Sequence, residues 1–319
     1  MDFYLVQFYF TMKHNLELLI WIKWRVKMSV SDYFSEFCKN LKMSDTVVSN
    51  IQSRYKQITK RINIDYYNST SDTNHSLYVG SYGRGTEIFT SDIDMIVQLP
   101  YETYVKFNNY TSNGQSALLQ EVKQVIQKTY NKSYIKGDGQ VIGINFTDGI
   151  DFEIVPAFIN KDNSYTYPDT NNGGSWKTTD PRKEIEAMNS MNSTTNKNLK
   201  RLCRMARAWK VTCNVPLNGI LIDTLAYKFI KDWKYNDKSY LYYDFMSRDF
   251  FEFLKNIDTS QSYWYAPGSN RYVWKKGNFQ TKAATAYTNS LDAIAYESNN
   301  QHYSSKQAWR EIYGTKFPG

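Results

Sequence analysis

The sequence predicts an α/β lobe with a mixed sheet, followed by a mostly α-helical lobe that meets the first along a cleft. Short segments with the alternating pattern of strands lie between helical segments up to Pro156. From about Asn196 onward, the apolar residues recur almost wholly at helical spacing. The chain has 319 residues, of which 41% are hydrophobic, so it can furnish a core for both lobes.

The first lobe is predicted over residues 29–190 and opens with two helices. Apolar residues recur at helical spacing from Ser29 to about Asn68, and Ser44 is placed to cap the second helix. A glycine-rich turn over 80–86 is expected after the first strand. In chain order, the other expected elements are strands 76–79 and 91–97, a helix over about 116–130, and strands 140–146 and 149–158.

The second lobe is predicted over residues 191–319. Apolar stripes over 199–209 and 220–229 indicate its first helices, and a polar, glycine-rich loop over 171–176 precedes them. Residues 1–28 are a possible N-terminal extension or an upstream start. Charged residues interrupt the apolar patch 18–22 well short of the ~18 apolar residues that a membrane span needs, so no membrane partner is expected.

Charge and cysteine content narrow the function. A formal charge of +8 favours polyanionic partners such as nucleotides or nucleic acid, although a basic surface kept for solubility explains it equally well. Cys38, Cys203 and Cys213 are too few and too unpatterned for a disulfide framework or a zinc site. A reducing cytoplasm therefore fits the chain best.

Asp92 and Asp94 are the first candidates for chemistry. Side chains two apart in a strand point to the same face with Cα atoms ~6–7 Å apart, so these carboxylates are paired. Two like charges at this spacing favour a bound cation, and Mg²⁺ prefers hard oxygen ligands completed by substrate phosphates. A two-metal site can activate an attacking hydroxyl and neutralise a leaving pyrophosphate.

Two neighbouring segments extend this candidate site. The glycine-rich turn before the aspartates can approach phosphates closely, and Ser81 supplies a hydroxyl. A third acidic ligand is expected from the apolar strand that carries Asp151 and Glu153, which share one face. One of these two residues is expected to be a solvated edge residue and the other a metal ligand.

Several motifs together resemble the nucleotidyltransferase superfamily of oligoadenylate synthases, animal cyclic GMP–AMP synthase and, most similar, the bacterial cyclic-oligonucleotide synthases (CD-NTases). The matching segments are 80–86, 91–94, 152–158, 167–179, 266–269 and 309–314. The resemblance covers about residues 29–319. It implies a polymerase-beta-like core with a mixed sheet, a mostly helical second lobe, and an active site in the cleft between them.

The resemblance also implies roles for individual residues. The third carboxylate lies at Glu153, where this chain departs from the aspartate of the family, and Asp151 remains the alternative. Trp176 either stacks on a base or anchors its loop. The residues expected to bind the nucleotide are Gly80, Ser81, Gly83, Arg84 and Thr86 in the first lobe and Arg204, Arg207 and Asn218 in the second, where a solvated basic face is the alternative for the arginines.

The function implied by the resemblance is synthesis of a cyclic di- or oligonucleotide second messenger from ribonucleoside triphosphates, with ATP and GTP as expected substrates. The implied cofactor is Mg²⁺, as two ions, for which Mn²⁺ can substitute. The product would act on an effector encoded elsewhere, in antiphage signalling (CBASS), and no stable nucleic-acid partner is expected. Two alternatives remain: a transferase that acts on RNA or a small acceptor, and a non-catalytic nucleotide or RNA sensor.

Overall fold

Two helices open the part of the chain that the computed structural model describes, which is residues 29–88 and 92–319. They are α2 (Val30–Asn40) and α3 (Asp45–Tyr67), as the sequence predicts. The Ser44 hydroxyl accepts a hydrogen bond from the Val47 backbone N–H and so caps α3, which confirms the expected cap. The expectations for residues 1–28 and for Ser91 lie outside the described residues.

A mixed sheet forms the centre of the first lobe. Its strand order is β1-β2-β5-β4-β3, and β6 and β7 extend it from β5. Strands β2 and β5 run parallel, and all other pairs are antiparallel. The strands are β1 (Ser76–Tyr78), β2 (Asp92–Gln98), β3 (Tyr134–Asp138), β4 (Val141–Asn145), β5 (Asp151–Ile159), β6 (Tyr165–Asp169) and β7 (Ser175–Thr179). The expected strands are confirmed, whereas β3, β6 and β7 escaped sequence analysis because their polar residues hide the alternation.

Helices cover the sheet and join it to the second lobe. The expected helix near residues 116–130 is confirmed as α6 (Gly114–Gln127), and α5 (Tyr101–Asn108) precedes it unpredicted. The expected turn over 80–86 was wrong in detail, because residues Gly80–Arg84 form the short helix α4. Gly85 ends α4 in the left-handed region at φ 64°, where glycine is favoured.

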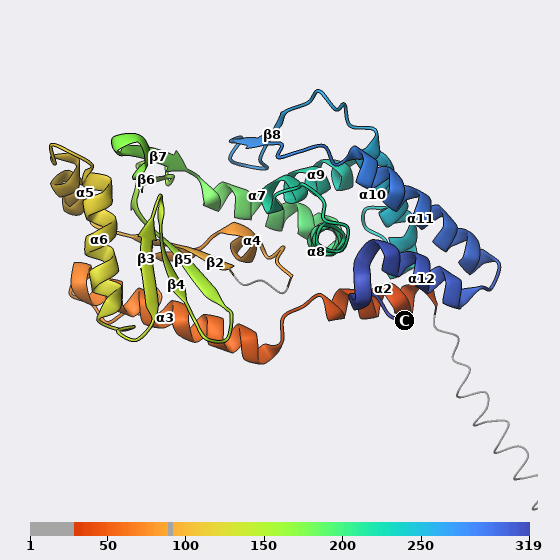
Figure 1. The fold of residues 1–319 in the computed structure, drawn as a ribbon, viewed down its shortest axis with the longest axis horizontal. Coiled ribbons are helices and arrows are strands. Elements are labelled where there is room, and N and C mark those ends of the chain that lie inside the picture. Colours follow the sequence, from red (N-terminus) through yellow and green to blue (C-terminus); the bar gives the residue numbers. More distant parts are fainter. Residues whose placement is uncertain (1–28, 89–91) are drawn as a thin grey trace, which may run out of the picture.

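The second lobe is mostly helical, as predicted (Figure 1). Helix formation begins earlier than expected, and a two-stranded hairpin interrupts it. The helices are α7 (Pro181–Thr194), α8 (Asn198–Thr212), α9 (Gly219–Asp232), α10 (Tyr243–Lys255), α11 (Gln280–Ser298) and α12 (His302–Tyr313), and the hairpin strands are β8 (Tyr263–Tyr265) and β9 (Tyr272–Trp274). Short 3₁₀ turns lie at Asn171–Gly173, Tyr240–Tyr242 and Gly314–Lys316.

Each lobe has its own hydrophobic core. The sheet packs on α3 and α6, whereas the core of the helical lobe includes the fully buried Trp209 and Trp309. Helix α2 contributes Phe34 and Phe37 to this second core, so the first described helix packs among the last ones (Figure 1). The chain between α2 and α3 therefore crosses from one lobe to the other. Among the described residues, no helix is both long and apolar enough to cross a membrane.

The carboxyl group of Asp244 makes the stability of this lobe depend on pH. Burial at the start of α10 raises its pKa to about 6 from 3.8. This difference in pKa corresponds to about 3 kcal/mol. The folded protein loses this free energy above the folded-state pKa, because the buried carboxyl group must ionise there. The free energy of unfolding contributed by Asp244 therefore falls as pH rises from about 4 to about 6.

Asp244→Asn is expected to raise the free energy of unfolding at pH 7.5 and to change it little at pH 4, as urea titrations at both pH values would measure. An equal effect at the two pH values would contradict this assignment.

Candidate active site

The candidate catalytic carboxylates lie on two neighbouring parallel strands. Asp92 and Asp94 begin β2, and the register pairs Asp92 with Asp151 and Asp94 with Glu153 on β5. Paired residues in adjacent strands share a face of the sheet, so the fold brings together the four acidic residues that sequence analysis selected. Asp92 and Glu153 are exposed, and Asp94 is half-buried.

These carboxylates repel one another. Burial raises the pKa of Asp94, Arg84 opposes this shift, and the charge of Asp92 adds to it. Burial likewise raises the pKa of Glu153, and the charges of Asp94 and Asp92 raise it further. A cation bound here would relieve this repulsion and favour the ionised carboxylates.

Asp151 is engaged away from this pair. Its carboxylate accepts hydrogen bonds from the Asn145 side chain at 2.6 Å and from the Phe146 backbone N–H at 3.2 Å. Glu153 instead neighbours Asp94, and its pKa responds to both β2 aspartates. The geometry therefore favours Glu153 over Asp151 as the third acidic group.

The donor set fits a hard divalent cation, since three carboxylates on one sheet face supply the oxygen ligands that Mg²⁺ prefers. The described side chains do not form a ready-made cluster of three or more His, Cys, Asp or Glu ligands. Magnesium commonly binds through one or two carboxylates and completes its coordination with water and substrate phosphates. An open carboxylate edge of this kind is compatible with that mode of binding.

Helix α4 packs tightly against Asp94 and against β1 because of its glycines. A Cβ atom on Gly80 would lie 1.8 Å from Asp94 Oδ2, and one on Gly83 would lie 2.4 Å from the Tyr78 carbonyl oxygen. Both glycines therefore let α4 approach its neighbours in the protein closely. The sequence also predicts that these glycines let the backbone approach phosphate groups. Ser81, which lies between them on α4, is half-buried.

Gly80→Ala is expected to lower kcat on the order of 100-fold, because the added methyl group must displace the Asp94 carboxylate. Gly149→Ala is the matched control. Gly149 also has a positive φ, 76°, but a Cβ atom there would meet nothing within 4 Å. Both variants carry the backbone strain of about 1 kcal/mol, and only Gly80→Ala carries the clash. Equal kcat values for the two variants would contradict the proposed contact.

A buried ion network joins α4 to the helical lobe. We use this name for Arg84, Thr86, Glu184, Arg207 and Asp223. Asp223 accepts hydrogen bonds from Arg84 Nε at 2.9 Å, Thr86 Oγ1 at 2.9 Å and Arg207 Nη1 at 2.6 Å. Arg84 Nη1 also lies 3.3 Å from Glu184. Burial alone would raise the pKa of Asp223, but the two arginines outweigh it and hold the pKa below its usual value.

This network changes the interpretation of three predicted phosphate ligands. Arg84, Thr86 and Arg207 are all buried and turned toward Asp223. Their observed contacts set the position of α4 relative to α8 and α9. Sequence analysis missed Asp223 and Glu184, although a carboxylate within the apolar stripe of α9 is costly to bury and was a usable signal.

The other predicted residues of the second lobe also have structural partners. Arg204 donates to the carbonyl oxygens of Glu87 and Gly85 at 2.9 and 2.8 Å, and its guanidinium lies 3.2 Å from the Glu87 carboxylate. The Asn218 side chain accepts the Leu221 N–H at 2.8 Å and so caps α9.

Trp176 anchors its strand in the first lobe. It donates to the Asn108 side chain at 3.0 Å, and its ring packs against those of Tyr104 and Phe158. Of the two roles considered for it, anchoring is the one that these contacts support.

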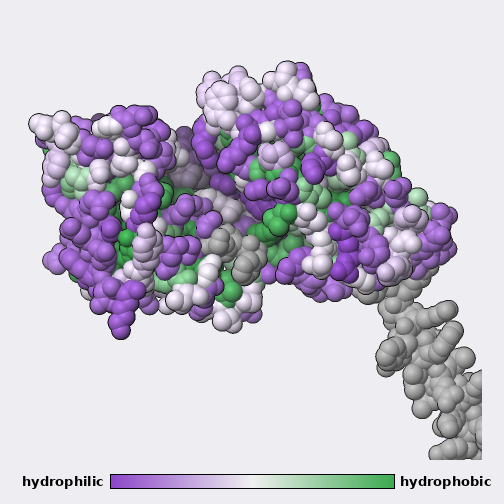
Figure 2. Space-filling view, in the orientation of Figure 1, coloured by the Kyte–Doolittle hydropathy of each residue, from purple (hydrophilic) through white to green (hydrophobic). Residues whose placement is uncertain are grey.

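A pocket of about 200 Å³ adjoins the carboxylates. Gly80 and Asp94 line it, together with residues that include Tyr167, Thr179 and Arg271. The space-filling view shows the surface hollowed between the two lobes (Figure 2). The pocket thus lies where the predicted cleft was expected to hold a substrate.

Comparison with known proteins identifies a family to which this chain is similar. Residues 28–192, more than half of the chain, match the family model of the Second Messenger Oligonucleotide or Dinucleotide Synthetase domain. A probable cyclic nucleotide synthase of Bacillus cereus strain VD146 is 27% identical over 179 residues, which cover 52% of this chain and 51% of that protein. The match thus spans about half the length of this relative.

Solved structures share the fold at low sequence identity. The CdnC of Escherichia coli MS115-1, in a CdnC:HORMA-deltaN complex, matches with a TM-score of 0.67 at 13% identity, over 91% of this chain and 98% of that one. The CD-NTase CdnG of Bradyrhizobium diazoefficiens, in complex with GTP, matches with a TM-score of 0.64 at 11% identity. This match covers 90% of this chain and 95% of that one. The di-nucleotide cyclase of Vibrio cholerae matches with a TM-score of 0.57 at 13% identity, over 97% of this chain and 91% of that one. These likenesses confirm the predicted fold class.

Proposed function

Since this chain belongs to the family of second messenger oligonucleotide or dinucleotide synthetases, whose members are nucleotidyltransferases, we propose that it condenses ribonucleoside triphosphates into a cyclic di- or oligonucleotide. A ribose hydroxyl of one nucleotide attacks the α-phosphorus of another. The new P–O bond replaces the bond to pyrophosphate, which leaves, and the hydroxyl loses its proton. Repeating the step within the linear product closes the ring.

One observation carries this proposal: Asp92, Asp94 and Glu153 share one face of adjacent, in-register parallel strands beside the cleft. These three residues would hold two Mg²⁺ ions, or Mn²⁺ in their place. When bound, the ions supply charge neutralisation and a more acidic attacking hydroxyl. The carboxylates keep the reacting groups aligned, and such alignment contributes much of the rate in phosphoryl transfer.

We assign binding of the donor, which is the nucleotide whose α-phosphorus is attacked, to Ser81 and to the backbone beside it. Gly80 packs directly against Asp94, and Ser81 is the next residue on α4, which supports this assignment. Arg204 supports the donor indirectly, by holding Gly85 and Glu87 through hydrogen bonds. The buried ion network and the Asn218 cap hold α4 and α9 in position beside this site.

We assign ATP and GTP as the nucleotides, because structural relatives were solved with ATP and with GTP. The product would act on an effector encoded elsewhere, in CBASS antiphage signalling. The three cysteines are unpaired, which supports a reducing cytoplasm as the compartment.

The proposal is tested by incubating the purified chain with all four radiolabelled ribonucleoside triphosphates and either Mg²⁺ or Mn²⁺. Phosphatase treatment and mass analysis would then identify resistant products. A cyclic product whose mass gives its bases and ring size supports the proposal. Label found only on an added RNA or small acceptor would overturn it in favour of an acceptor-directed transferase. Nucleotide binding without any transfer would favour a sensor.

A further inference from the structure

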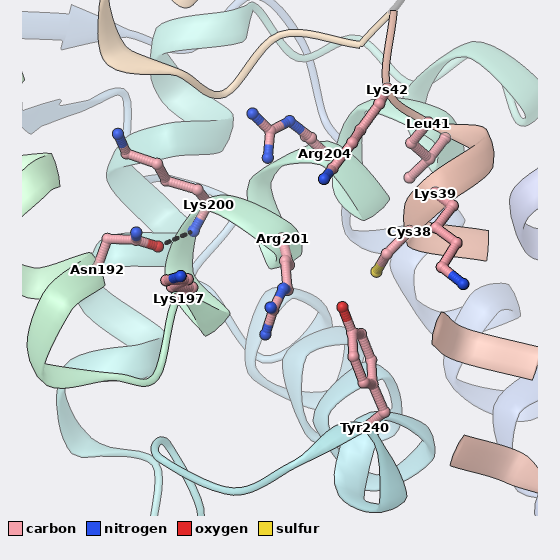
Figure 3. Close-up of a pocket in the computed structure, with 10 residues that line it drawn as sticks. All are labelled: Cys38, Lys39, Leu41, Lys42, Asn192, Lys197, Lys200, Arg201, Arg204 and Tyr240. Atoms are coloured by element: carbon pink, nitrogen blue, oxygen red, sulfur yellow. Dashed lines mark hydrogen bonds between the residues drawn. The ribbon is translucent and has the colours of Figure 1, made fainter. Parts of the chain in front are cut away.

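A second pocket, of about 300 Å³, lies between the end of α2 and the start of α8. It shares no lining residue with the pocket beside the carboxylates. Figure 3 shows its side chains coming from the end of α2, from α8 and from the Tyr240–Tyr242 turn toward one space. Six of them are cationic: Lys39, Lys42, Lys197, Lys200, Arg201 and Arg204. We call this the basic pocket.

The charges of the basic pocket are largely uncompensated. Its described lining contains no carboxylate. The contacts that orient its cations come mainly from neutral groups: Lys200 Nζ donates to the Asn189 side chain at 2.6 Å, and Arg201 donates to the Tyr243 hydroxyl at 3.2 Å. Of the six cations, Arg204 alone forms an ion pair with a residue in the described part of the chain, namely Glu87 at 3.2 Å.

Lys200 is held in a partly buried position close to Arg204 and Gly85. Burial lowers its pKa, and the positive charge of Arg204 lowers it further. The Lys200 ammonium also lies next to Gly85, where an added Cβ atom would meet Nζ at 2.9 Å. Six cations line one pocket, and among the described residues Glu87 is the one carboxylate paired with any of them, so the pocket favours a ligand of opposite charge.

We propose that the basic pocket binds a compact polyanion with two or more adjacent phosphate groups, which is not the nucleotide consumed in the cleft. Its volume matches a single small molecule, since ligand pockets begin at about 300 Å³. Nucleic acids, in contrast, are bound over about 600–1,000 Å² of surface even by single modules. Arg201 lies over the Tyr240 ring at 4.8 Å, which fixes its guanidinium at the pocket wall.

The position of the basic pocket links it to the proposed active site. Arg204 is shared between the pocket and the segment that follows α4, where it holds the carbonyl oxygens of Gly85 and Glu87. A phosphate group that binds Arg204 competes with these carbonyls for its N–H groups. This consequence rests on the proposed function, whereas binding of the anion does not.

The proposal is tested by calorimetric titration of inorganic triphosphate into the full chain in EDTA, which removes metal-bridged binding at Asp92 and Asp94. We expect saturable binding of one triphosphate per chain. Lys42→Ala with Lys197→Ala is expected to weaken it about 100-fold, because two phosphate contacts are lost and each corresponds to about tenfold, or about 1.4 kcal/mol. Both lysines are exposed and neither forms an ion pair with a described residue, so the fold should tolerate the change.

The matched control is Lys60→Ala with Lys132→Ala, which removes the same charge from exposed positions of the first lobe. This pair should leave the dissociation constant unchanged. Absence of saturable binding, or equal weakening in both pairs, would overturn the proposal. A short RNA that displaces triphosphate through Lys42 and Lys197 with higher affinity would also overturn it, in favour of a nucleic-acid site. Because no turnover is measured, failure of the proposed synthase activity would leave this result intact.

Discussion

Asp94→Asn is expected to lower kcat on the order of 1,000-fold or more while leaving the fold intact. Asp94 lies at the centre of the carboxylate group, beside Gly80, Asp92 and Glu153. The amide has the same shape but no charge, so it removes the attraction for a divalent cation that neutralises the transition state. The change also relieves the repulsion that raises the pKa of Glu153, so stability should be retained or improved.

Two further variants decide which residue on β5 is the third ligand. Glu153→Gln should reduce kcat as strongly as Asp94→Asn, whereas Asp151→Asn should have little effect, because Asp151 is bonded to Asn145 and Phe146. Steady-state assays at saturating metal, with circular dichroism as the folding control, would measure these effects. The reverse order of sensitivity would transfer the role to Asp151.

Asp223→Ala is expected to lower the free energy of unfolding by about 3–5 kcal/mol. The substitution leaves the guanidinium groups of Arg84 and Arg207 buried without their counter-charge, and an unpaired buried charge is costly. The Thr86 hydroxyl loses its acceptor as well. Urea titration at neutral pH, followed by tryptophan fluorescence, would measure the loss.

Arg271→Ala is a matched comparison at the rim of the same region. Arg271 pairs with Glu184, but its side chain is 46% exposed, and exposed ion pairs contribute about 0–1 kcal/mol. A loss below 1 kcal/mol for Asp223→Ala, or equal losses for the two variants, would mean that the buried ion network does not hold the lobes together. We also expect Asp223→Ala to reduce kcat, since Arg84 sits on α4 next to the carboxylates.

Local pattern was enough to predict much of this protein. The alternation around Asp92 and Asp94 predicted strand β2 and a paired-carboxylate face, and the helical stripes predicted α8 and α9. The cap at Ser44 was equally local. These features depend on residues within one or two turns of one another, so the chain encodes them without reference to the rest of the fold.

Tertiary structure decided what those residues contact. The register between β2 and β5 set Glu153 beside Asp94, and no pattern within either strand specifies that register. Arg84 and Arg207 look like solvated or phosphate-binding cations in the sequence, yet both are buried against Asp223, 139 and 16 residues away. Long-range pairing of this kind depends on how the lobes pack, because burial raises the cost of an unpaired charge and so selects its partner. The sequence therefore determined which chemistry the chain carries, and only the folded structure decided which charged groups face the cleft and which hold it in shape.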